Sequence, residues 1–498
     1  MRDLIDNIQN GIEVRANLIK LKEILKEASE IDAFLKLIDW DMDFFRKHLQ
    51  HEDAKVRKNI LQIIGICELD GLADDVFAAY QQENTLFVRS EYLKVLKNWD
   101  VKVYLDAFAK QQRELMEQEE KEEMAKHTSA ELRLLSDILK QYGRMKKHQF
   151  IGGDTMSVMI LTTLSGKEKY LKDAIDRTIG EGKTTLVRGG VKVVSSDYDN
   201  LMKVRCFQEM LFVLPKATAI TGEKKGEQIA NAGIVSYLEE RLSGNSAISF
   251  RLDVRGALDA DEKAKLIRNT SKELEYASKN RLVNAPSDYE VEIRLMKKKS
   301  EKEEYAVYLK IPLLKDERFA YRKNALATSI QPYVAAMMME IAAPYIEGRG
   351  QVLDPFCGVG TLLMERNYKE HAHSIYGVDI YKEAIVAAGE HAKRARMDIH
   401  YVQKDMAEFT HGYLFDLLVT NPPVPSQKLP KSEIVRIYQT FFDKCREWLK
   451  EEAVLVIYSQ AADVFAEVLK KNAEFQVLVK TDIYKKKQSV MYVLRYIG

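Results

Sequence analysis

Cysteine is scarce in this sequence, and its placement argues against two kinds of small, cross-linked site. Cys67, Cys206, Cys357 and Cys445 are widely separated, and none forms a CxxC pair. Structural zinc sites and disulfide frameworks need paired or closely spaced cysteines. We therefore expect no metal site, and we expect the chain to work in a reducing compartment.

Long apolar runs are also absent. No stretch of 18 consecutive apolar residues occurs, and the N-terminal segment MRDLIDNIQNGIEVR lacks the apolar core of a signal peptide. The sequence thus predicts neither a membrane span nor a secretion signal, and a cytoplasmic location is expected.

The chain has almost no excess of charge of either sign. Its 76 Lys and Arg residues face 75 Asp and Glu residues, for a formal net charge of +1. A global electrostatic attraction to nucleic acid is therefore excluded, and any contact with nucleic acid must come from a local basic patch.

The length of 498 residues indicates about three domains at roughly 150 residues each. Residues 1–140 contain few Gly and Pro, and their apolar residues recur at helical spacing. Val-Arg pairs at 14–15, 56–57 and 88–89 each open such a stretch, and Asp53 is placed to cap one of these helices. This pattern resembles HEAT-like helical repeats; a plain helical bundle is the alternative.

Two regions with mixed elements follow. Residues 150–320 alternate between strands and helices, with a hairpin expected around Gly189-Gly190, and predict an α+β domain. Residues 325–498 alternate more regularly and end in two paired strands. They predict a doubly wound, Rossmann-like α/β sheet with an antiparallel end.

A glycine turn marks the first chemical motif. Asp354 ends an expected strand, and Gly358 and Gly360 follow before a helix. Glycine there allows a tight turn and a close approach of the backbone to a ligand. A carboxylate at Asp354 would repel a pyrophosphate but suits the ammonium group of a methionine moiety. This favours S-adenosylmethionine over a dinucleotide.

Two further acidic residues end the next two strands. Asp379 is placed to accept hydrogen bonds from ribose hydroxyls, and Asp405 from an adenine amino group, with Met406 beside the ring. Any one of these aspartates is equally well explained as a helix N-cap. Three of them at the ends of consecutive strands favour a cofactor site.

The second chemical motif is Asn421-Pro422-Pro423, after another expected strand. An exocyclic amine is a poor nucleophile because its lone pair is delocalised. The side-chain oxygen of Asn421 and the carbonyl of Pro422 would accept its hydrogens and hold it in line with a methyl group. Such catalysis works by positioning and needs no strong base.

At the level of families, residues 156–498 resemble the THUMP-domain RNA methyltransferases, in particular those that methylate N2 of guanosine in transfer RNA. The resemblance is carried by DPFCGVGT at 354–361, DERFAYRKN at 316–324 and MILTTLSGKEKYLKDAI at 159–175. It implies a THUMP-like middle domain that binds transfer RNA and a class I methyltransferase domain at 325–498.

The resemblance also implies roles for single residues. Catalysis would fall to Asn421, Pro422 and Pro423. The implied contacts to S-adenosylmethionine are Asp354, Phe356, Gly358, Gly360, Thr361, Asp379, Ile380, Asp405, Met406 and Ser329. The implied phosphate contacts are Arg251, Arg255, Lys263, Lys265 and Arg268, each of which is equally well explained as ordinary surface charge.

One position departs from this family. Val424 stands where relatives usually place an aromatic residue that stacks on the target base. Tyr438, Phe441 and Phe319 are candidate replacements. Two alternatives to RNA methylation therefore remain: methylation of a DNA or protein amide nitrogen, and a catalytically weakened RNA-binding or scaffold protein whose N-terminal helices bind a protein partner.

Overall fold

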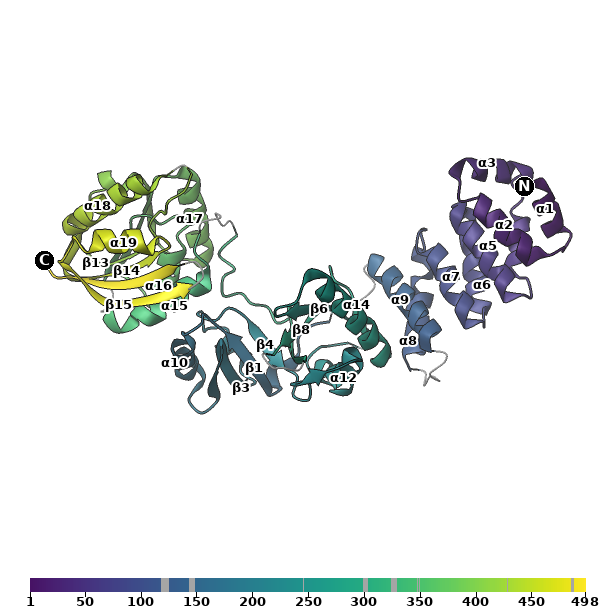
Figure 1. Ribbon diagram of the computed structural model, residues 1–498, viewed down its shortest axis with the longest axis horizontal. Helices are drawn as coiled ribbons and strands as arrows, with labels where there is room; N and C mark the ends of the chain where they lie inside the picture. Colours follow the sequence, from purple (N-terminus) through teal and green to yellow (C-terminus); the bar gives the residue numbers. More distant parts are fainter. Residues whose placement is uncertain are drawn as a thin grey trace. The chain divides into compact units, whose positions relative to one another are not determined.

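The chain folds into two compact units, neither of which is a single continuous segment. The computed structural model describes residues 1–117, 125–142, 148–244, 246–298, 303–323, 329–346, 348, 350–427, 429–484 and 488–498 (Figure 1). One unit comprises residues 1–151 and 214–313, and the other residues 152–213 and 314–498. The middle region expected as one domain at 150–320 is thus divided between the two units.

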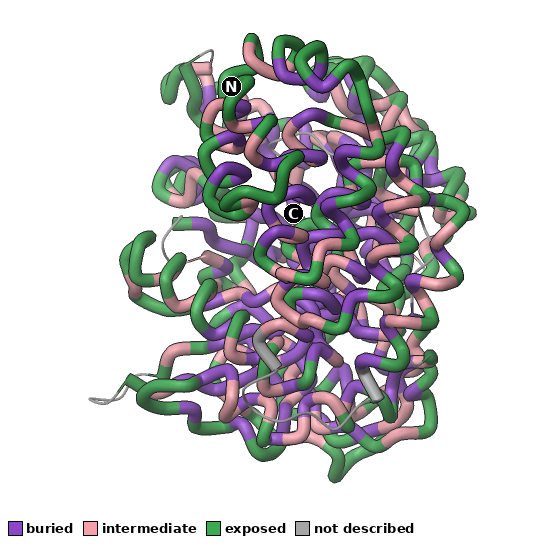
Figure 2. The backbone as a smooth tube through the Cα atoms, turned by 90° about the vertical axis from the view of Figure 1, so that its right-hand side faces the viewer, coloured by how far each residue is buried: buried purple, intermediate pink, exposed green. Residues whose placement is uncertain are grey.

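The first unit begins with helices. They are α1 (Arg2–Gln9), α2 (Val14–Ile24), α3 (Ala28–Leu37), α4 (Asp43–Leu49), α5 (Ala54–Ile66), α6 (Ala73–Gln82), α7 (Leu86–Leu96), α8 (Leu105–Glu117) and α9 (Ala125–Gln141). Buried and exposed positions alternate along them, as Figure 2 shows, because one apolar stripe of each helix packs into a shared core. The helical character predicted for this region is confirmed.

The Val-Arg pairs act in packing. Asp53 accepts the backbone N–H of Lys55, so the predicted cap of α5 is confirmed. Arg57 donates two hydrogen bonds to Glu83, at 2.7 and 2.8 Å. Arg89 binds the fully buried carboxylate of Glu131. The valine of each pair is buried or half-buried, and these two arginines fasten one helix to a later segment. Whether this pattern makes the helices HEAT repeats stays a prediction.

The same unit ends in an α+β segment. Its elements are β5 (Ile220–Thr221), α12 (Lys225–Asn231), α13 (Ile234–Glu239), β6 (Ile248–Arg255), α14 (Ala260–Ala277), β7 (Leu282–Asn284), β8 (Val291–Lys297) and β9 (Glu304–Lys310). Strand β6 pairs in parallel with β7 and β8, and β9 pairs antiparallel with β8 and β5. Helix α14 packs against α12 and β6.

The second unit opens with a small antiparallel sheet. Its elements are β1 (Ser157–Thr162), α10 (Glu168–Ile179), β2 (Thr184–Val187), β3 (Gly190–Ser195), α11 (Tyr198–Leu201) and β4 (Met210–Val213). Strand β1 pairs with β3 and β4, and β2 pairs with β3. The hairpin predicted around Gly189-Gly190 is confirmed, since Gly189 turns between β2 and β3 with a φ of 77°.

The rest of this unit is the doubly wound domain. It contains α15 (Pro332–Ala342), β10 (Gln351–Asp354), α16 (Thr361–Lys369), β11 (Ser374–Asp379), α17 (Lys382–Ala395), β12 (His400–Gln403), β13 (Phe415–Thr420), α18 (Lys431–Trp448), β14 (Leu449–Ser459), α19 (Ala462–Leu469), β15 (Phe475–Tyr484) and β16 (Ser489–Tyr496). The strand order is β12-β11-β10-β13-β14-β16-β15. The first five strands are parallel, and β16 is antiparallel to both neighbours. The predicted α/β sheet with an antiparallel end is confirmed.

Two arginines join the small sheet of this unit to the doubly wound domain. Arg318 is 5% exposed; it binds both carboxylate oxygens of Asp316 and donates to the carbonyls of Val204 and Phe207. Arg205 binds Glu365 of α16 through two hydrogen bonds of 2.7 and 2.8 Å. The hydroxyl of Tyr321 also donates to Glu365, at 2.8 Å. The helix that follows the glycine turn is therefore anchored to residues 152–213.

This anchor predicts a large loss of stability when its carboxylate is removed. Glu365→Ala leaves the buried guanidinium of Arg205 without its counter-charge, which is expected to lower the free energy of unfolding by about 3–5 kcal/mol. Urea denaturation measures the change. Asp443→Ala, which breaks the exposed pair with Arg446, is the control and is expected to cost less than about 1 kcal/mol. Equal effects of the two substitutions would contradict the role given to Glu365.

Candidate active site

The candidate site lies where the order of the parallel strands reverses. Strands β10 and β13 are neighbours, although β11 and β12 come between them in the sequence. In doubly wound sheets the crevice outside the carboxyl ends of two such strands is the usual ligand site. Asp354 ends β10, and Asn421 directly follows Thr420 at the end of β13. The two chemical motifs are thus brought together at one edge.

The turn after β10 favours glycine at two positions and requires it at Gly360. Gly358 and Gly360 have φ angles of 51° and 79°, in the left-handed region that other residues rarely adopt. A Cβ atom on Gly360 would lie 2.2 Å from the Tyr401 hydroxyl. The backbone N–H of Gly358 donates to Asp379 Oδ2 at 2.8 Å, which ties the turn to the end of β11.

Asp354 is the central charged group of this edge. It is 1% exposed, and its Oδ1 accepts hydrogen bonds from the Thr420 hydroxyl at 2.7 Å and from the Phe356 N–H at 3.0 Å. Its Oδ2 is buried without a partner among the described residues. Burial raises the pKa of Asp354 to about 7, because the charged form loses its hydration.

Three more buried polar atoms at this edge have no protein partner in the described part of the chain. They are the hydroxyl of Thr361, the first residue of α16, the hydroxyl of Tyr401 and the Oδ1 of Asn421. An unsatisfied buried polar atom costs free energy, so four of them at one edge call for an explanation. A ligand with polar groups facing Asp354, Thr361 and Asn421 would supply partners for three of them.

Most of the other predicted cofactor contacts follow the carboxyl ends of β10, β11 and β12. Asp379 already accepts the N–H groups of Gly358 and Tyr381, and Ile380 is 56% exposed next to it. Asp405 is exposed and accepts the N–H of Ala407, so it does cap a short helix. Met406 is 6% exposed and belongs to the core. Phe356 is partly buried and packs against Phe441, and Ser329 is partly exposed just before α15.

Two of the expected replacements for the aromatic at position 424 are wrong. Tyr438 and Phe441 are both 0% exposed, because the apolar face of α18 packs them into the core beneath the sheet. The Tyr438 hydroxyl instead donates a hydrogen bond of 2.8 Å to the Pro423 carbonyl and so anchors the Asn421-Pro422-Pro423 segment to α18. Phe319 is partly exposed, with the guanidinium carbons of Arg205 and Arg318 each 5.0 Å from its ring centre.

Sequence reasoning missed two residues of this edge. Thr420 is 0% exposed and joins β13 to Asp354, and Tyr401 of β12 fills the space beside Gly360. Thr420 had one signal, since it ends the strand just before Asn421. Nothing in the sequence distinguished Tyr401 from any other strand residue.

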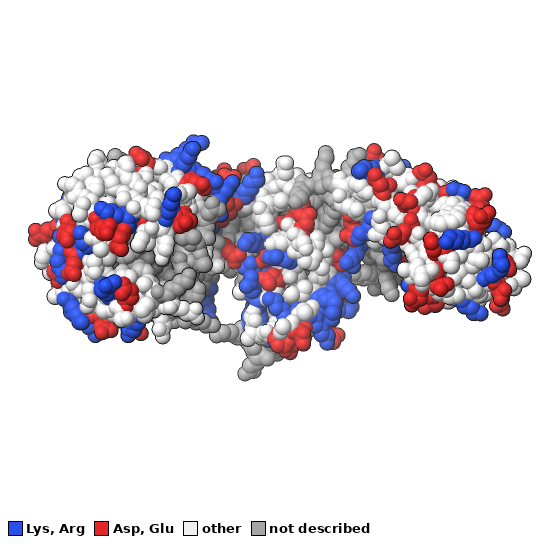
Figure 3. Space-filling model, turned by 90° about the horizontal axis from the view of Figure 1, so that it is seen from above, with Lys and Arg blue, Asp and Glu red and all other residues white. Residues whose placement is uncertain are grey.

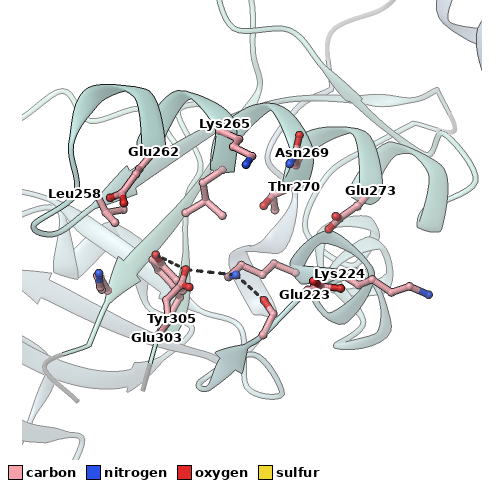
Figure 4. Close-up of a pocket in the computed structure, with 14 residues that line it drawn as sticks. Glu223, Lys224, Leu258, Glu262, Lys265, Asn269, Thr270, Glu273, Glu303 and Tyr305 are labelled. Carbon is pink, nitrogen blue, oxygen red and sulfur yellow. Dashed lines mark hydrogen bonds and ion pairs between the residues drawn. The ribbon is translucent and has the colours of Figure 1, made fainter. Parts of the chain in front are cut away.

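The basic residues expected to contact phosphates belong to the other unit. Arg251 is paired with Glu292, and both Arg255 and Lys263 are paired with Asp253. Lys265 lines a cavity of about 830 Å³ between α14 and the segments around Gly222 and Tyr305, together with Lys224, Lys225 and Lys297 (Figure 4). Arg268 lies on the same helix. Both signs of charge are mixed over the surface in Figure 3, with one group of basic side chains near the middle of the view.

Comparisons with known proteins match the C-terminal part of the chain to methyltransferases. Residues 320–487 match the family model described as "RMKL-like, methyltransferase domain". The chain is 28% identical over 160 residues to a tRNA (guanine(6)-N2)-methyltransferase of Archaeoglobus fulgidus, covering 27% of this chain and 40% of the relative. It is 30% identical over 97 residues to a release factor glutamine methyltransferase of Bacillus subtilis, covering 19% and 34%. The chain thus spans less than half the length of these curated relatives.

Two solved structures share the fold over a larger part of the chain. TrmN from Thermus thermophilus matches with a TM-score of 0.55 at 18% identity, covering 68% of this chain and 99% of that one. A predicted N6-adenine-specific DNA methylase from Listeria monocytogenes matches with a TM-score of 0.50 at 16% identity, covering 69% and 97%. No described helix is both long and apolar enough to cross a membrane. The chain therefore carries a methyltransferase domain of the class I fold, an enzyme domain whose cofactor is S-adenosylmethionine.

Proposed function

We propose that this chain methylates an exocyclic base nitrogen in transfer RNA, and that the acceptor is N2 of guanosine. The observation that carries the proposal is the Oδ1 of Asn421, which is buried without a partner among the described residues at the same sheet edge as Asp354. An amide oxygen held there can accept one hydrogen of an amine while a neighbouring carbonyl accepts the other; an amine nitrogen presents two hydrogens, whereas a hydroxyl presents only one.

The crevice fits the methyl donor. Asp354 Oδ2 would bind the donor's ammonium group, the Thr361 hydroxyl and Ser329 would contact its carboxyl end, and the Gly358–Gly360 turn allows close approach. Asp379 would accept from the ribose. Around the adenine, the remaining predicted contacts are Phe356, Ile380, Asp405 and Met406. When bound, S-adenosylmethionine supplies a methyl group attached to a positively charged sulfur.

Asn421, Pro422 and Pro423 would handle the acceptor. Asn421 Oδ1 and the Pro422 carbonyl would each accept one hydrogen of the amine, which turns the nitrogen lone pair toward the methyl group. The hydrogen bond from Tyr438 to the Pro423 carbonyl fixes the backbone at this point. The chemistry is catalysis by positioning, with preformed acceptors and no reorganisation during the reaction.

Transfer RNA is proposed as the substrate on two grounds. A relative with matching sequence is a tRNA (guanine(6)-N2)-methyltransferase, and the segment 214–313 has a cavity lined by four lysines and four glutamates, whose lysines would contact phosphates. Lys265 lines this cavity and would contact phosphates, with Arg268 on the same helix. Arg251, Arg255 and Lys263 would be available only by breaking their ion pairs. In this proposal the segment 214–313 acts as the THUMP-like RNA-binding part, and the HEAT-like helices bind a protein partner.

A second candidate acceptor is a protein amide nitrogen. The match to a release factor glutamine methyltransferase favours it, because a glutamine amide also presents two hydrogens on a delocalised nitrogen. Val424, which offers no aromatic ring beside the acceptor, would instead fit a weakened enzyme that binds RNA without modifying it.

Asn421→Ala is the direct test of the acceptor site. Removing the amide oxygen is expected to lower the rate of methyl transfer to total transfer RNA by roughly 100- to 1,000-fold, the usual effect of losing one preorganised hydrogen-bonding group. Transfer of a labelled methyl group measures the rate, and calorimetry checks that S-adenosylmethionine still binds. Activity within threefold of the original chain would refute the role of Asn421; Asp443→Ala, remote and exposed, serves as the control.

The raised pKa of Asp354 predicts a pH dependence of cofactor binding. The carboxyl must be ionised to pair with the ammonium group, and its pKa of about 7 means that ionisation is incomplete at acid pH. The affinity for S-adenosylmethionine is therefore expected to rise roughly tenfold between pH 5.5 and pH 7. Asp354→Asn should bind more weakly and show no such rise.

The same shift has a consequence for the ligand-free protein. A carboxyl whose folded-state pKa lies above its unfolded value stabilises the fold below pH 4, and this contribution is lost as the pH rises to about 7. The free energy of unfolding of Asp354→Asn, measured in urea, should lack this decline. Identical pH profiles of the two proteins would show that Asp354 does not titrate in this range.

A further inference from the structure

Two tyrosines from distant parts of the sequence meet at the acceptor side of the sheet. Tyr333 lies in the first turn of α15, and Tyr484 is the last residue of β15. Their hydroxyl oxygens are 2.7 Å apart, and both side chains are partly exposed. Burial raises the pKa of both groups, so each hydroxyl keeps its proton at neutral pH and the pair stays hydrogen-bonded.

The strand register places this pair at the same edge as Asn421. Thr420 of β13 lies beside Ile457 of β14, so Asn421 is level with Tyr458. Ser459 of β14 lies beside Val490 of β16, and Ser489 of β16 lies beside Tyr484 of β15. The ends of β13 and β15 are three strand spacings apart, about 14 Å between backbones.

Tyr333 reaches the same edge, because its hydroxyl is hydrogen-bonded to that of Tyr484 at the end of β15. Both tyrosines therefore lie at the carboxyl-terminal edge of the sheet, on the β15 side of Asn421.

The end of β15 is also fixed from a second side. Thr481, three residues before Tyr484, accepts a hydrogen bond of 2.5 Å from the ammonium group of Lys167, a side chain only 6% exposed. The backbone N–H of Tyr484 donates to the Ser489 hydroxyl at 3.1 Å. A ring held on such a support loses little freedom when it binds a flat ligand.

The chain has no aromatic ring at position 424 to stack on a base, and Tyr333 and Tyr484 can supply one. Val424 has no π face, and Tyr438 and Phe441, two of its candidate replacements, are fully buried. A base taken out of its stack requires a new stacking surface, and one aromatic ring can lower its dissociation constant by about 5- to 150-fold.

We propose that Tyr333 and Tyr484 form the platform on which the target base lies while its amine faces Asn421. The proposal rests on the proposed function in one respect, that the acceptor is part of a nucleic acid base. The rings would stack on the base, and the hydroxyl pair would fix their orientation. The two tyrosines would thus provide the stacking surface that the Val424 side chain lacks.

The test compares variants in methylation of total transfer RNA. Tyr484→Ala and Tyr333→Ala are each expected to raise the KM for RNA by about 5- to 150-fold. Tyr484→Phe, which keeps the ring and loses one hydrogen bond, should change KM less than about fivefold. Val424→Tyr combined with Tyr484→Ala should recover most of the loss. The control is Tyr413→Ala, an exposed tyrosine just before β13 at the opposite edge of the sheet.

A second measurement does not depend on methyl transfer. The original chain is mixed with S-adenosylhomocysteine and total transfer RNA and irradiated with ultraviolet light, and crosslinked peptides are mapped by mass spectrometry. Crosslinks at Tyr333 or Tyr484 that disappear in the alanine variants support the platform. Calorimetry with S-adenosylhomocysteine, which should bind all variants equally, separates this effect from damage to the cofactor site.

The two hypotheses fail in different ways. If transfer RNA is not methylated but the crosslinks fall on these tyrosines, the proposed function is wrong and the platform stands. If transfer RNA is methylated and both alanine variants keep an unchanged KM, the platform is wrong and the function stands. If transfer RNA is not methylated and no crosslink reaches either tyrosine, both are wrong.

Discussion

The hydrogen bond from the Thr420 hydroxyl to Asp354 Oδ1 connects the two halves of the chemistry. It is 2.7 Å long, fully buried, and joins the last residues of β10 and β13, the two strands at the reversal of the sheet. One oxygen of Asp354 is thereby used by the fold, and the other is buried with no partner in the part of the chain that the structure describes. Because Asn421 follows Thr420 directly, this bond also sets how far the acceptor motif lies from the cofactor motif.

Local sequence patterns were sufficient to predict the part of the site that consists of β10 and the glycine turn after it. The order Asp354, Gly358, Gly360 predicts a strand, a tight turn and a helix, because the strand must end before the glycines turn the chain into α16. The sheet with its antiparallel end followed from regular alternation of element types. Ile434, Tyr438, Phe441 and Cys445 repeat at helical spacing along one face of α18, and this apolar stripe in the sequence accounts for the burial of Tyr438 and Phe441.

Contacts between distant residues could not be predicted from one sequence. Arg205 and Glu365 are separated by 160 positions, and Tyr333 and Tyr484 by 151. No local rule of spacing or propensity relates such residues; only the packing of whole elements brings them together. The division of the chain into units has the same origin. Residues 152–213 pack with the methyltransferase domain through Arg205 and Arg318, although the segment that follows them in sequence belongs to the other unit.

The central claim is that the acceptor is a base nitrogen in transfer RNA, and the modified nucleoside itself tests it most directly. Total transfer RNA from cells with and without this gene is digested and its nucleosides are compared by mass spectrometry. Loss of N2-methylguanosine in the deletion strain, restored by the original gene and not by one encoding Asn421→Ala, is the predicted result. An unchanged nucleoside profile, together with S-adenosylmethionine bound by the purified protein, would contradict the claim.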